Sequence, residues 1–457
     1  MPWLGVGEQM PSIALAVGTA LVTGVLTLVD LKMGIGFIVF ISLFHLVFCY
    51  PHKVFLFFIL SFPLFSHIPK VALGGFPGIT FERVMIFLLT AVVFLRKDSS
   101  SCSPINRTAI LLMAAFLISV LYACFRSMPE HQRYSFQILI DAYMLTFMIF
   151  YLGTKLFFNK IDVAKDRWIF LVLGAYVAAL GIAESVFRYD FFPSEVGLRE
   201  TDIYVRANGP FVSSETFGLF LGICLFTAIY LKNIQQEEWR FKEICALVLM
   251  AAGILSSMNR GITISALCAF AFPYPLNLRR QIKLLTAGGF LILCAALLFP
   301  YISETDFYRD RIANYENIAT RLSANLSAYA IIIDYPFTGI GLNNFADFAN
   351  RNEYNLFFEK YSRPTTIHNA FLDVMAETGL IGLVPFFGLI AAVMGMFIKC
   401  RKHGVDGHST GFSVLIMFFF PFFSDNLTKE SPGNYIFAIF VAAACSLLMK
   451  KKLPKTQ

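Results

Sequence analysis

The chain has 457 residues, of which 57% are hydrophobic and 15% are charged, and its mean hydropathy is +0.67. These values lie outside the range of soluble globular proteins, so they exclude an ordinary soluble enzyme and indicate that lipid is the main solvent of the chain. The net charge of +7 does not indicate nucleic-acid binding, because basic residues of membrane proteins gather in the loops on one side.

Apolar windows of the length that spans a membrane, about 20 residues, follow one another from Ser12 to Met449. They lack the alternation of polar and apolar residues that is typical of membrane barrels. We therefore predict an all-α fold, a polytopic transmembrane helix bundle of about 12–14 spans. In chain order the predicted spans are residues 12–29, 35–50, 54–67, 83–96, 108–125, 136–157, 168–187, 212–231, 243–258, 261–277, 283–302, 370–398, 411–427 and 434–449.

The N-terminal residues lack the basic region and the small-residue cleavage site of a secretory signal, so the first apolar run is predicted to be the first span. The cysteines lie in apolar runs or, for Cys102 and Cys400, in predicted cytoplasmic loops. Disulfide bonds are therefore not expected.

Basic residues indicate the orientation. More than half of the 37 lysine and arginine residues fall in alternate loops that share one side with the N-terminus, so this side is predicted to be cytoplasmic. The predicted organisation has three parts: residues 1–302 form a transmembrane bundle of about 11 spans, residues 303–369 an external, periplasmic loop, and residues 370–457 the C-terminal transmembrane helices with a basic cytoplasmic tail.

The external loop is far longer than the other connections, and loops of this length usually carry function. Five apolar residues recur in it at helical spacing and predict an amphipathic helix that lies across the outer mouth of the bundle: Ile318, Leu322, Leu326, Tyr329 and Ile333. Pro336 and the turn at residues 339–341 are expected to end this helix.

Four arginines fall on the external side and are candidates for binding phosphate: Arg206, Arg260, Arg321 and Arg363. The guanidinium group stays charged and donates paired hydrogen bonds to phosphate oxygens. Several of these arginines at headgroup level would hold a pyrophosphate without a metal. The alternative is that each arginine contacts lipid headgroups at the end of a span.

His368 lies where the external loop enters the helix predicted at 370–398, and histidine accepts a proton near neutral pH. The alternative is a loop histidine held by local hydrogen bonds. Asn369, Asp373 and Glu377 follow at helical spacing. Asn369 is suited to cap the helix, and Glu377 is expected to face the bundle interior, where it either orients a catalytic group or forms a structural ion pair.

Other acidic residues lie at or inside apolar runs, and we interpret them as structural. Asp141 and Glu184 are interpreted as members of buried pairs, and Glu215 as a partner of Arg206. The first external loop, residues 30–34, has no paired-acid motif, the external histidines do not cluster, and Glu304 with Asp306 is the nearest acidic pair, of a kind common in solvated loops. No phosphate-binding glycine loop occurs. We therefore predict no metal, no cofactor and no nucleotide site.

Three blocks of the chain, in order, resemble the O-antigen ligase and polymerase superfamily of bacterial surface-glycan assembly. The blocks are RANGPFVSSETFGLFLGI, SSMNRGITISAL, and TRLSANLSAYAIIIDYPFTGIGLNNF followed by IHNAFLDVMAETGLIGL. They lie within residues 205–383, under half of the chain. The resemblance implies a membrane glycosyltransferase fold of the GT-C-like type.

The resemblance also implies roles for individual residues. Arg206 and Arg260, with Arg321, would bind the pyrophosphate of a polyprenyl-linked glycan, and His368 would be the base that deprotonates the acceptor hydroxyl. Arg363, Asn369 and Glu377 would support this site. The implied reaction is an inverting, metal-independent transfer on the periplasmic side of the bacterial inner membrane.

Alternatives concern the acceptor and the class of protein. The implied partners are the polyprenyl-pyrophosphate-linked glycan donor, membrane lipids, and an acceptor that is the lipid A core for a ligase or another lipid-linked glycan for a polymerase; we favour the ligase. A glycolipid transporter is a further alternative, but no related halves or charged internal pathway is evident. A non-enzymatic scaffold is the third.

Overall fold

A computed structural model describes residues 42–65, 80–95, 107–159, 162, 167–192, 205–235, 237–271, 315–351, 353–354, 365–402 and 408–452. The predicted spans at 12–29 and 283–302 lie outside these residues, and so does Arg363. Within them the chain is helical, in agreement with the predicted all-α class. A helix over Ser42–Cys49 precedes α3.

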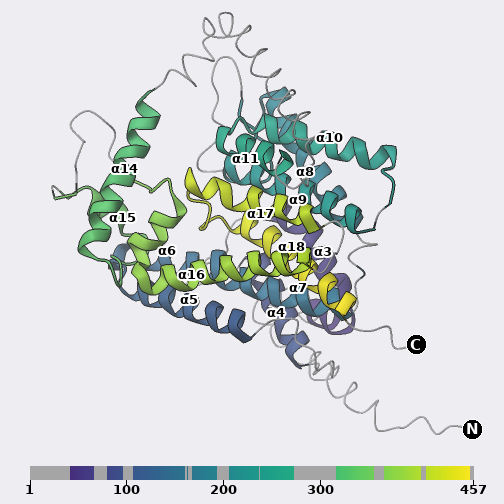
Figure 1. Ribbon diagram of the computed structural model, residues 1–457, viewed down its shortest axis with the longest axis horizontal. Helices are drawn as coiled ribbons and strands as arrows, with labels where there is room; N and C mark the ends of the chain where they lie inside the picture. Colours follow the sequence, from purple (N-terminus) through teal and green to yellow (C-terminus); the bar gives the residue numbers. More distant parts are fainter. Residues whose placement is uncertain are drawn as a thin grey trace, which may run out of the picture. The chain divides into compact units, whose positions relative to one another are not determined.

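The helices, labelled as in Figure 1, have the following bounds. They are α3 Pro51–Phe65, α4 Phe81–Leu95, α5 Arg107–Phe125, α6 Pro129–Ile138, the π-helix η1 Leu139–Met144, α7 Leu145–Asn159, α8 Trp168–Phe187, α9 Ser214–Gln235, α10 Phe241–Ser256, α11 Arg260–Ala271, α14 Tyr315–Asp334, α15 Phe345–Ala349, α16 Ala370–Lys402, α17 His408–Phe419, the 3-10 helix η3 Phe420–Phe423 and α18 Ser431–Lys452.

Several of these helices have the length and apolar composition of membrane spans. Among the described residues there are five, or six if the helices Ser42–Cys49 and Pro51–Phe65, bent by 113°, form one span. The five are Arg107–Phe125, Pro129–Phe157, Trp168–Phe187, Ser214–Gln235 and Ala370–Ile398. Shorter apolar helices occur at Arg260–Ala271, Thr410–Phe423 and Ser431–Leu447. The chain is thus an all-α polytopic membrane bundle, as predicted.

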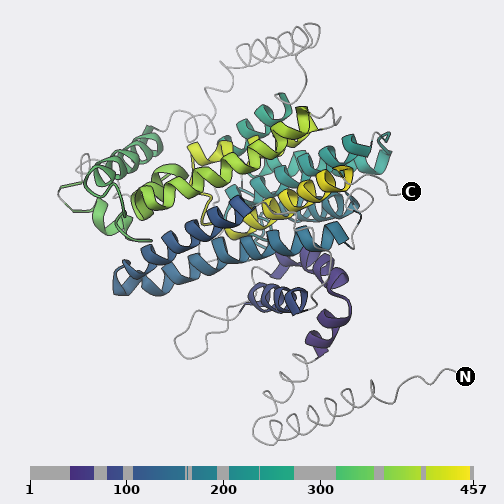
Figure 2. The ribbon, with the colours of Figure 1, turned by 60° about the horizontal axis from the view of Figure 1, so that its bottom comes forward.

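The chain divides into two compact units, one made of Met1–Ile59 and Val84–Ser99 and the other of Leu60–Arg83 and Ser100–Gln457. All the candidate site residues belong to the second unit. Within it, α7 packs against α18 and α5 against α16, and these four helices run alongside one another (Figures 1 and 2). Helix α9 is almost wholly buried among α8, α10, α11, α17 and α18.

Helix α16 is bent near its start, where the sequence predicts an unbroken span. Gly379 has non-helical dihedral angles, with φ +66° and ψ −165°. The bend releases the N–H groups of Leu380 and Ile381, which donate hydrogen bonds to the carbonyls of Pro336 and Phe337 at 2.9 and 3.2 Å. A Cβ atom on Gly379 would lie 2.2 Å from the Phe337 carbonyl oxygen, so only glycine fits this contact.

The turn that ends α14 also bonds to the other side of this bend. The N–H groups of Ile340 and Gly341 donate to the carbonyls of Ala376 and Glu377 at 2.9 and 3.1 Å. Gly339 has φ +63°, and a Cβ there would lie 2.4 Å from the Glu377 backbone. The proline-glycine turn and the glutamate-glycine helix of the third sequence block are therefore one backbone joint, which fixes α14 relative to α16.

Candidate functional site

A short polar segment, Ser424–Glu430, connects η3 to α18 and contacts three of the predicted site residues, Arg321, His368 and Glu377. The helices on either side of it are apolar, whereas this segment offers polar backbone and side-chain groups. Residues that other helices bring to the same end of the bundle bind to these groups.

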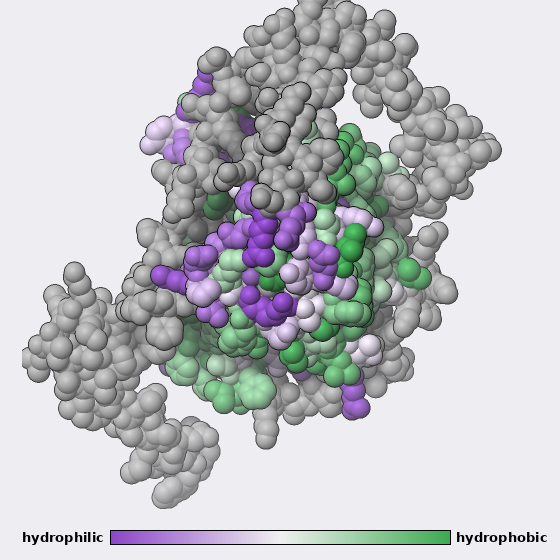
Figure 3. Space-filling view, turned by 90° about the vertical axis from the view of Figure 1, so that its left-hand side faces the viewer, coloured by the Kyte–Doolittle hydropathy of each residue, from purple (hydrophilic) through white to green (hydrophobic). Residues whose placement is uncertain are grey.

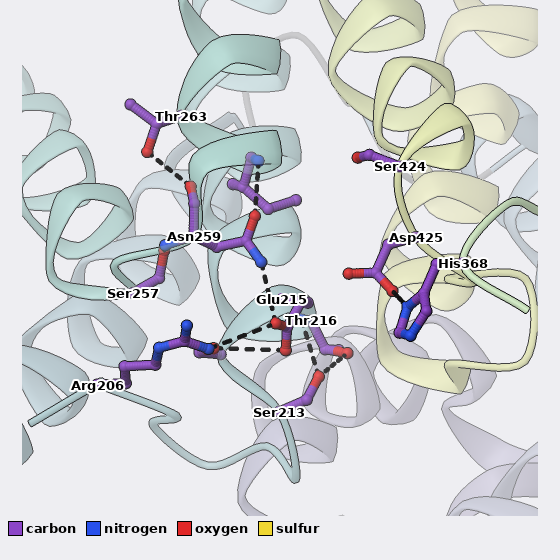
Figure 4. A network of polar contacts seen from close by, with 12 residues as sticks. Arg206, Ser213, Glu215, Thr216, Ser257, Asn259, Thr263, His368, Ser424 and Asp425 are labelled. Atoms are coloured by element: carbon purple, nitrogen blue, oxygen red, sulfur yellow. Dashed lines mark hydrogen bonds and ion pairs between the residues drawn. The ribbon is translucent and has the colours of Figure 1, made fainter. Parts of the chain in front are cut away.

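Arg206 lies in the loop before α9 and points its guanidinium toward Glu215 in the first turn of that helix (Figure 4). Its Nη1 is 3.8 Å from Oε1 of Glu215, and the Arg206 Nε is buried without a hydrogen-bond partner among the described residues. Glu215 also accepts a hydrogen bond from Nδ2 of Asn259 at 3.0 Å. The predicted partnership of Arg206 with Glu215 is confirmed, and it leaves part of the guanidinium available for a ligand.

A buried carboxylate on α8, that of Glu184, binds the loop that carries Arg206. Oε2 of Glu184 accepts hydrogen bonds from the backbone N–H groups of Asn208 and Gly209 at 3.1 and 2.6 Å, and Glu184 is fully buried. Ser185 adds a hydrogen bond from its hydroxyl to the Val205 carbonyl at 2.7 Å. Glu184 thus orders the backbone that follows the arginine, and Ser185 orders the residue before it; Glu184 bonds to backbone N–H groups where an ion pair was expected.

Asn259 joins this group to α11. Its Oδ1 accepts the hydrogen bond of the Ile262 N–H at 2.9 Å and caps the helix that begins at Arg260. The Arg260 side chain is exposed and makes no ion pair within the described part of the chain. The next residue, Gly261, lies so near the polar segment that an added Cβ would be 2.8 Å from Oγ of Ser424.

Arg321 and His368 meet at the same polar segment. Arg321, on α14, donates from Nη1 to the Ser424 carbonyl at 2.8 Å, and its Nη2 is 3.8 Å from Oδ2 of Asp425. Nδ1 of His368 is 3.4 Å from Oδ1 of the same Asp425. Both side chains remain partly accessible, with 43% of the Arg321 and 27% of the His368 side chain exposed.

Lys429, in the same segment, pairs with two buried carboxylates. Nζ of Lys429 is 2.9 Å from Oδ2 of Asp373 and 2.7 Å from Oε2 of Glu377, and both carboxylates are almost fully buried on α16. Burial opposes the charge of Lys429, but the two carboxylates hold the pKa of its ammonium group well above the usual range. Glu377 also accepts the N–H of Asn343 at 2.8 Å. Of its two predicted roles, Glu377 makes the ion pair, and that pair ties α16 to the polar segment.

Glu430, at the end of the polar segment, links it to α9. The hydroxyl of Thr216 donates to Oε2 of Glu430 at 3.2 Å. Burial raises the pKa of the Glu430 carboxyl to about 6, the Thr216 hydrogen bond opposes the rise, and the carboxylates of Glu215 and Asp425 add to it.

Three helices begin at this site, each after a capping side chain. Ser213 accepts from the Thr216 N–H at 3.2 Å before α9, Asn259 caps α11, and Oδ1 of Asn369 accepts from the N–H groups of Phe371 and Leu372 at 3.0 and 3.1 Å before α16. The capping role predicted for Asn369 is confirmed. Helix N-termini carry partial positive charge, so they add to the arginines in favouring an anion.

The structure therefore links Arg206, Arg321 and His368 through neighbouring contacts, whereas no polar contact of the Arg260 side chain is found among the described residues. Arg206 connects through Glu215 and Asn259 to the start of α11, and Gly261 beside Arg260 connects to the polar segment. This segment then contacts Arg321 and His368. Figure 4 shows the His368 and Asp425 pair across from Glu215 and Asn259.

Sequence reasoning missed five residues of these contacts, namely Asn259, Ser424, Asp425, Lys429 and Glu430. Asp425 and Lys429 lie in FFSDNLTKE, a polar interruption between two apolar runs. The predicted span at 411–427 includes Asp425, whereas the structure ends the helix at Phe423. A carboxylate is costly in lipid, so the presence of Asp425 inside the predicted span indicates that the span ends before this residue.

The fold and the site define a multi-pass helical membrane protein with cationic side chains and a histidine at one end of its bundle. Residues 245–387 match the family model described as O-antigen ligase. This match supports the predicted membership of the O-antigen ligase and polymerase superfamily, and hence a glycosyltransferase-like enzyme of ligase or polymerase type. The matched region includes Arg260, Arg321 and His368. No curated protein matches the chain.

Proposed function

We propose that this protein transfers a glycan from polyprenyl pyrophosphate to an acceptor hydroxyl at the periplasmic face of the bacterial inner membrane. The observation that carries the proposal is the contact of His368 and Arg321 with one carboxylate, Asp425. A base and a phosphate-binding cation are thereby held next to each other, as a transfer between a hydroxyl and a pyrophosphate ester requires.

His368 is the proposed general base. Its Nδ1 faces Asp425, so a proton on Nδ1 is held by the carboxylate and the other ring nitrogen, Nε2, accepts the proton of the acceptor hydroxyl. The hydroxyl oxygen then bonds to the anomeric carbon of the donor sugar from the face opposite the leaving group. The bond from that carbon to the pyrophosphate oxygen breaks, the pyrophosphate takes the electron pair, and the configuration is inverted.

The arginines stabilise the group that departs. The leaving pyrophosphate gains negative charge in the transition state, so fixed guanidinium groups lower the barrier more than they strengthen ground-state binding. Arg206 is oriented by Glu215 and Arg321 by Ser424, while Arg260 is exposed at the start of α11. The donor is already activated, so the reaction needs no nucleotide, cofactor or metal.

The favoured acceptor is a sugar of the lipid A core, which makes the protein an O-antigen ligase. The alternative is a polymerase that joins lipid-linked repeat units. Both reactions use the same base and the same arginines, so the productive acceptor distinguishes them.

The test is glycan transfer by purified protein, with a polyprenyl-pyrophosphate-linked donor, EDTA, and the two acceptors in separate reactions. His368→Ala should lose about 100- to 10,000-fold in rate, the usual contribution of a general base. His131→Ala is the matched control, because His131 also pairs with a carboxylate, Asp347 at 2.6 Å, but outside this network.

Wild type that is active in EDTA, with activity kept by His131→Ala and lost by His368→Ala, supports the proposal. Full activity of His368→Ala would remove the base from the mechanism. Wild type that moves a lipid-linked glycan across a bilayer without forming a glycosidic bond would favour the transporter instead.

A further inference from the structure

Helix α14 has two unlike faces. The face that packs on the rest of the protein is built mainly from small side chains, namely Ser323, Ala324, Ser327, Ala328 and Ile331, all buried. The opposite face carries the large apolar residues Leu322, Tyr329 and Ile333, whose exposed fractions are 58%, 59% and 62%. The amphipathic pattern in the sequence thus marks the surface that the described part of the chain leaves uncovered. Small residues make the packed face, as in helix contacts within membranes.

The adjacent helix α16 shows where the membrane begins. Before Gly379 it carries Asp373 and Glu377, which pair with Lys429. After Gly379, residues 380–398 contain no charged side chain, and about 19 residues of helix reach about 28 Å, close to the thickness of the hydrocarbon core. A span of this length that starts after Gly379 would place the bend at one boundary of that core.

The residues that follow α14 are hydrogen-bonded to α16 at this bend. Phe337 accepts a backbone hydrogen bond from Ile381 at 3.2 Å, and its side chain is 67% exposed. Ile381 and Val384, in the uncharged part of α16 after Gly379, are 52% and 63% exposed. The open apolar surface of the span therefore continues through Phe337 toward the exposed face of α14.

The direction of α14 fits this placement. Figure 1 shows α14 crossing the direction of α16 and α5 at one end of the bundle, as a helix that lies along a membrane surface does. On this side of the molecule, hydrophilic side chains gather in one zone with hydrophobic side chains next to them (Figure 3). The packed face of α14 is covered by the segment that includes Phe345, Ala349 and Tyr354.

We propose that α14 lies in the outer headgroup region of the bilayer, with Leu322, Tyr329 and Ile333 inserted among the upper acyl chains. Leu326 lies between these positions on the helix surface, and no charged residue does. The part of the helix surface that would enter the bilayer is therefore entirely apolar. Tyrosine is a residue that favours this depth. Lipid docking then sets the depth of Arg321, which precedes Leu322 and contacts Ser424.

The test is fluorescence of a single tryptophan in proteoliposomes made with lipids brominated near the headgroup or near the chain end. In a background with Trp3, Trp168 and Trp239 replaced by Phe, Tyr329→Trp and Leu322→Trp each report on the exposed face of α14. Glu130→Trp is the matched control, because Glu130 is exposed in the first turn of the polar helix α6. This measurement does not depend on catalysis, so its failure is distinguishable from failure of the proposed function.

We expect blue-shifted emission from Tyr329→Trp and Leu322→Trp, with stronger quenching by the lipid brominated near the headgroup, and no such quenching of Glu130→Trp. Red-shifted, unquenched emission from both α14 variants would overturn the proposal by placing this face in water. Blue-shifted emission that no brominated lipid quenches would also overturn it, because another protein surface, such as a second copy of the chain, would then cover the helix.

Discussion

The carboxylate of Asp425 lies 3.4 Å from Nδ1 of His368 and 3.8 Å from Nη2 of Arg321. One acidic residue therefore positions two side chains that come from distant parts of the chain. Asp425 itself is fixed in a short segment whose carbonyl at Ser424 also binds Arg321. Such an arrangement selects the tautomer of the histidine, since the ring nitrogen that faces a carboxylate carries the proton.

Replacement of Asp425 by asparagine tests this relationship. The amide keeps the size of the side chain but removes the charge that holds the Nδ1 proton, so we expect the rate of transfer to fall by about 10- to 100-fold, less than when the base itself is removed. Asp347→Asn, which changes the equivalent partner of His131, should leave the rate unchanged. An Asp425→Asn protein with wild-type kcat would show that the carboxylate does not orient the base.

The arginine at the start of this network allows a second prediction. Arg206→Lys keeps the positive charge but loses the planar fork, so it should lower kcat/KM for the lipid-linked donor by about 100-fold, the order found for loss of one transition-state donor. Arg351→Lys is the control, because Arg351 is exposed and stacks on Phe348 outside the network. Equal kcat/KM values for both variants and wild type would argue against a role for Arg206 in binding pyrophosphate.

Glu184 is predicted to act through the backbone of the Arg206 loop. Glu184→Ala leaves the N–H groups of Asn208 and Gly209 without their buried acceptor, at a cost of about 1–3 kcal/mol in unfolding free energy, whereas Glu184→Gln retains one acceptor oxygen. We expect KM for the donor to rise strongly in the alanine variant and to recover in part with glutamine. A loss of thermal stability in both variants with unchanged KM would limit Glu184 to a structural role.

The sequence was sufficient for the class of fold and for most helix positions, because span length and composition follow directly from the thickness of the bilayer. Helix α8, predicted at 168–187, has those bounds in the structure. The bend at Gly379 was not predicted, since a glycine inside an apolar run resembles any other residue of a span until its backbone partner, the turn at residues 336–341, is known.

The candidate site was predictable only in part. Arg206, Arg260, Arg321 and His368 were identifiable from residue type and predicted side of the membrane, but no spacing along the chain shows that distant loops meet. The contacts through Asp425 depend on the exact end of η3, four residues before the predicted end of the span. Such boundaries are the least certain part of a sequence interpretation because apolar composition changes gradually.

The ion pairs of Lys429 give a prediction for stability. Lys429→Met leaves the carboxylates of Asp373 and Glu377 buried without their partner, so we expect the unfolding free energy to fall by about 3–5 kcal/mol. Adding Glu377→Gln should restore part of the loss, because one of the two buried charges is then removed. Thermal unfolding in detergent measures both variants, and a Tm of Lys429→Met equal to that of wild type would contradict the structural role of the pair.

Glu430 predicts how stability depends on pH. Its folded-state pKa is raised from 4.5 to about 6, so the protonated carboxyl is favoured in the folded protein, and this contribution is complete below pH 4.5 and is lost as the pH rises through 6. Glu430→Gln does not titrate, so its unfolding free energy relative to wild type should increase between these pH values by at most about 2 kcal/mol. Thermal unfolding measured at several pH values would contradict the raised pKa if the difference in Tm between Glu430→Gln and wild type were constant from pH 4.5 to 7.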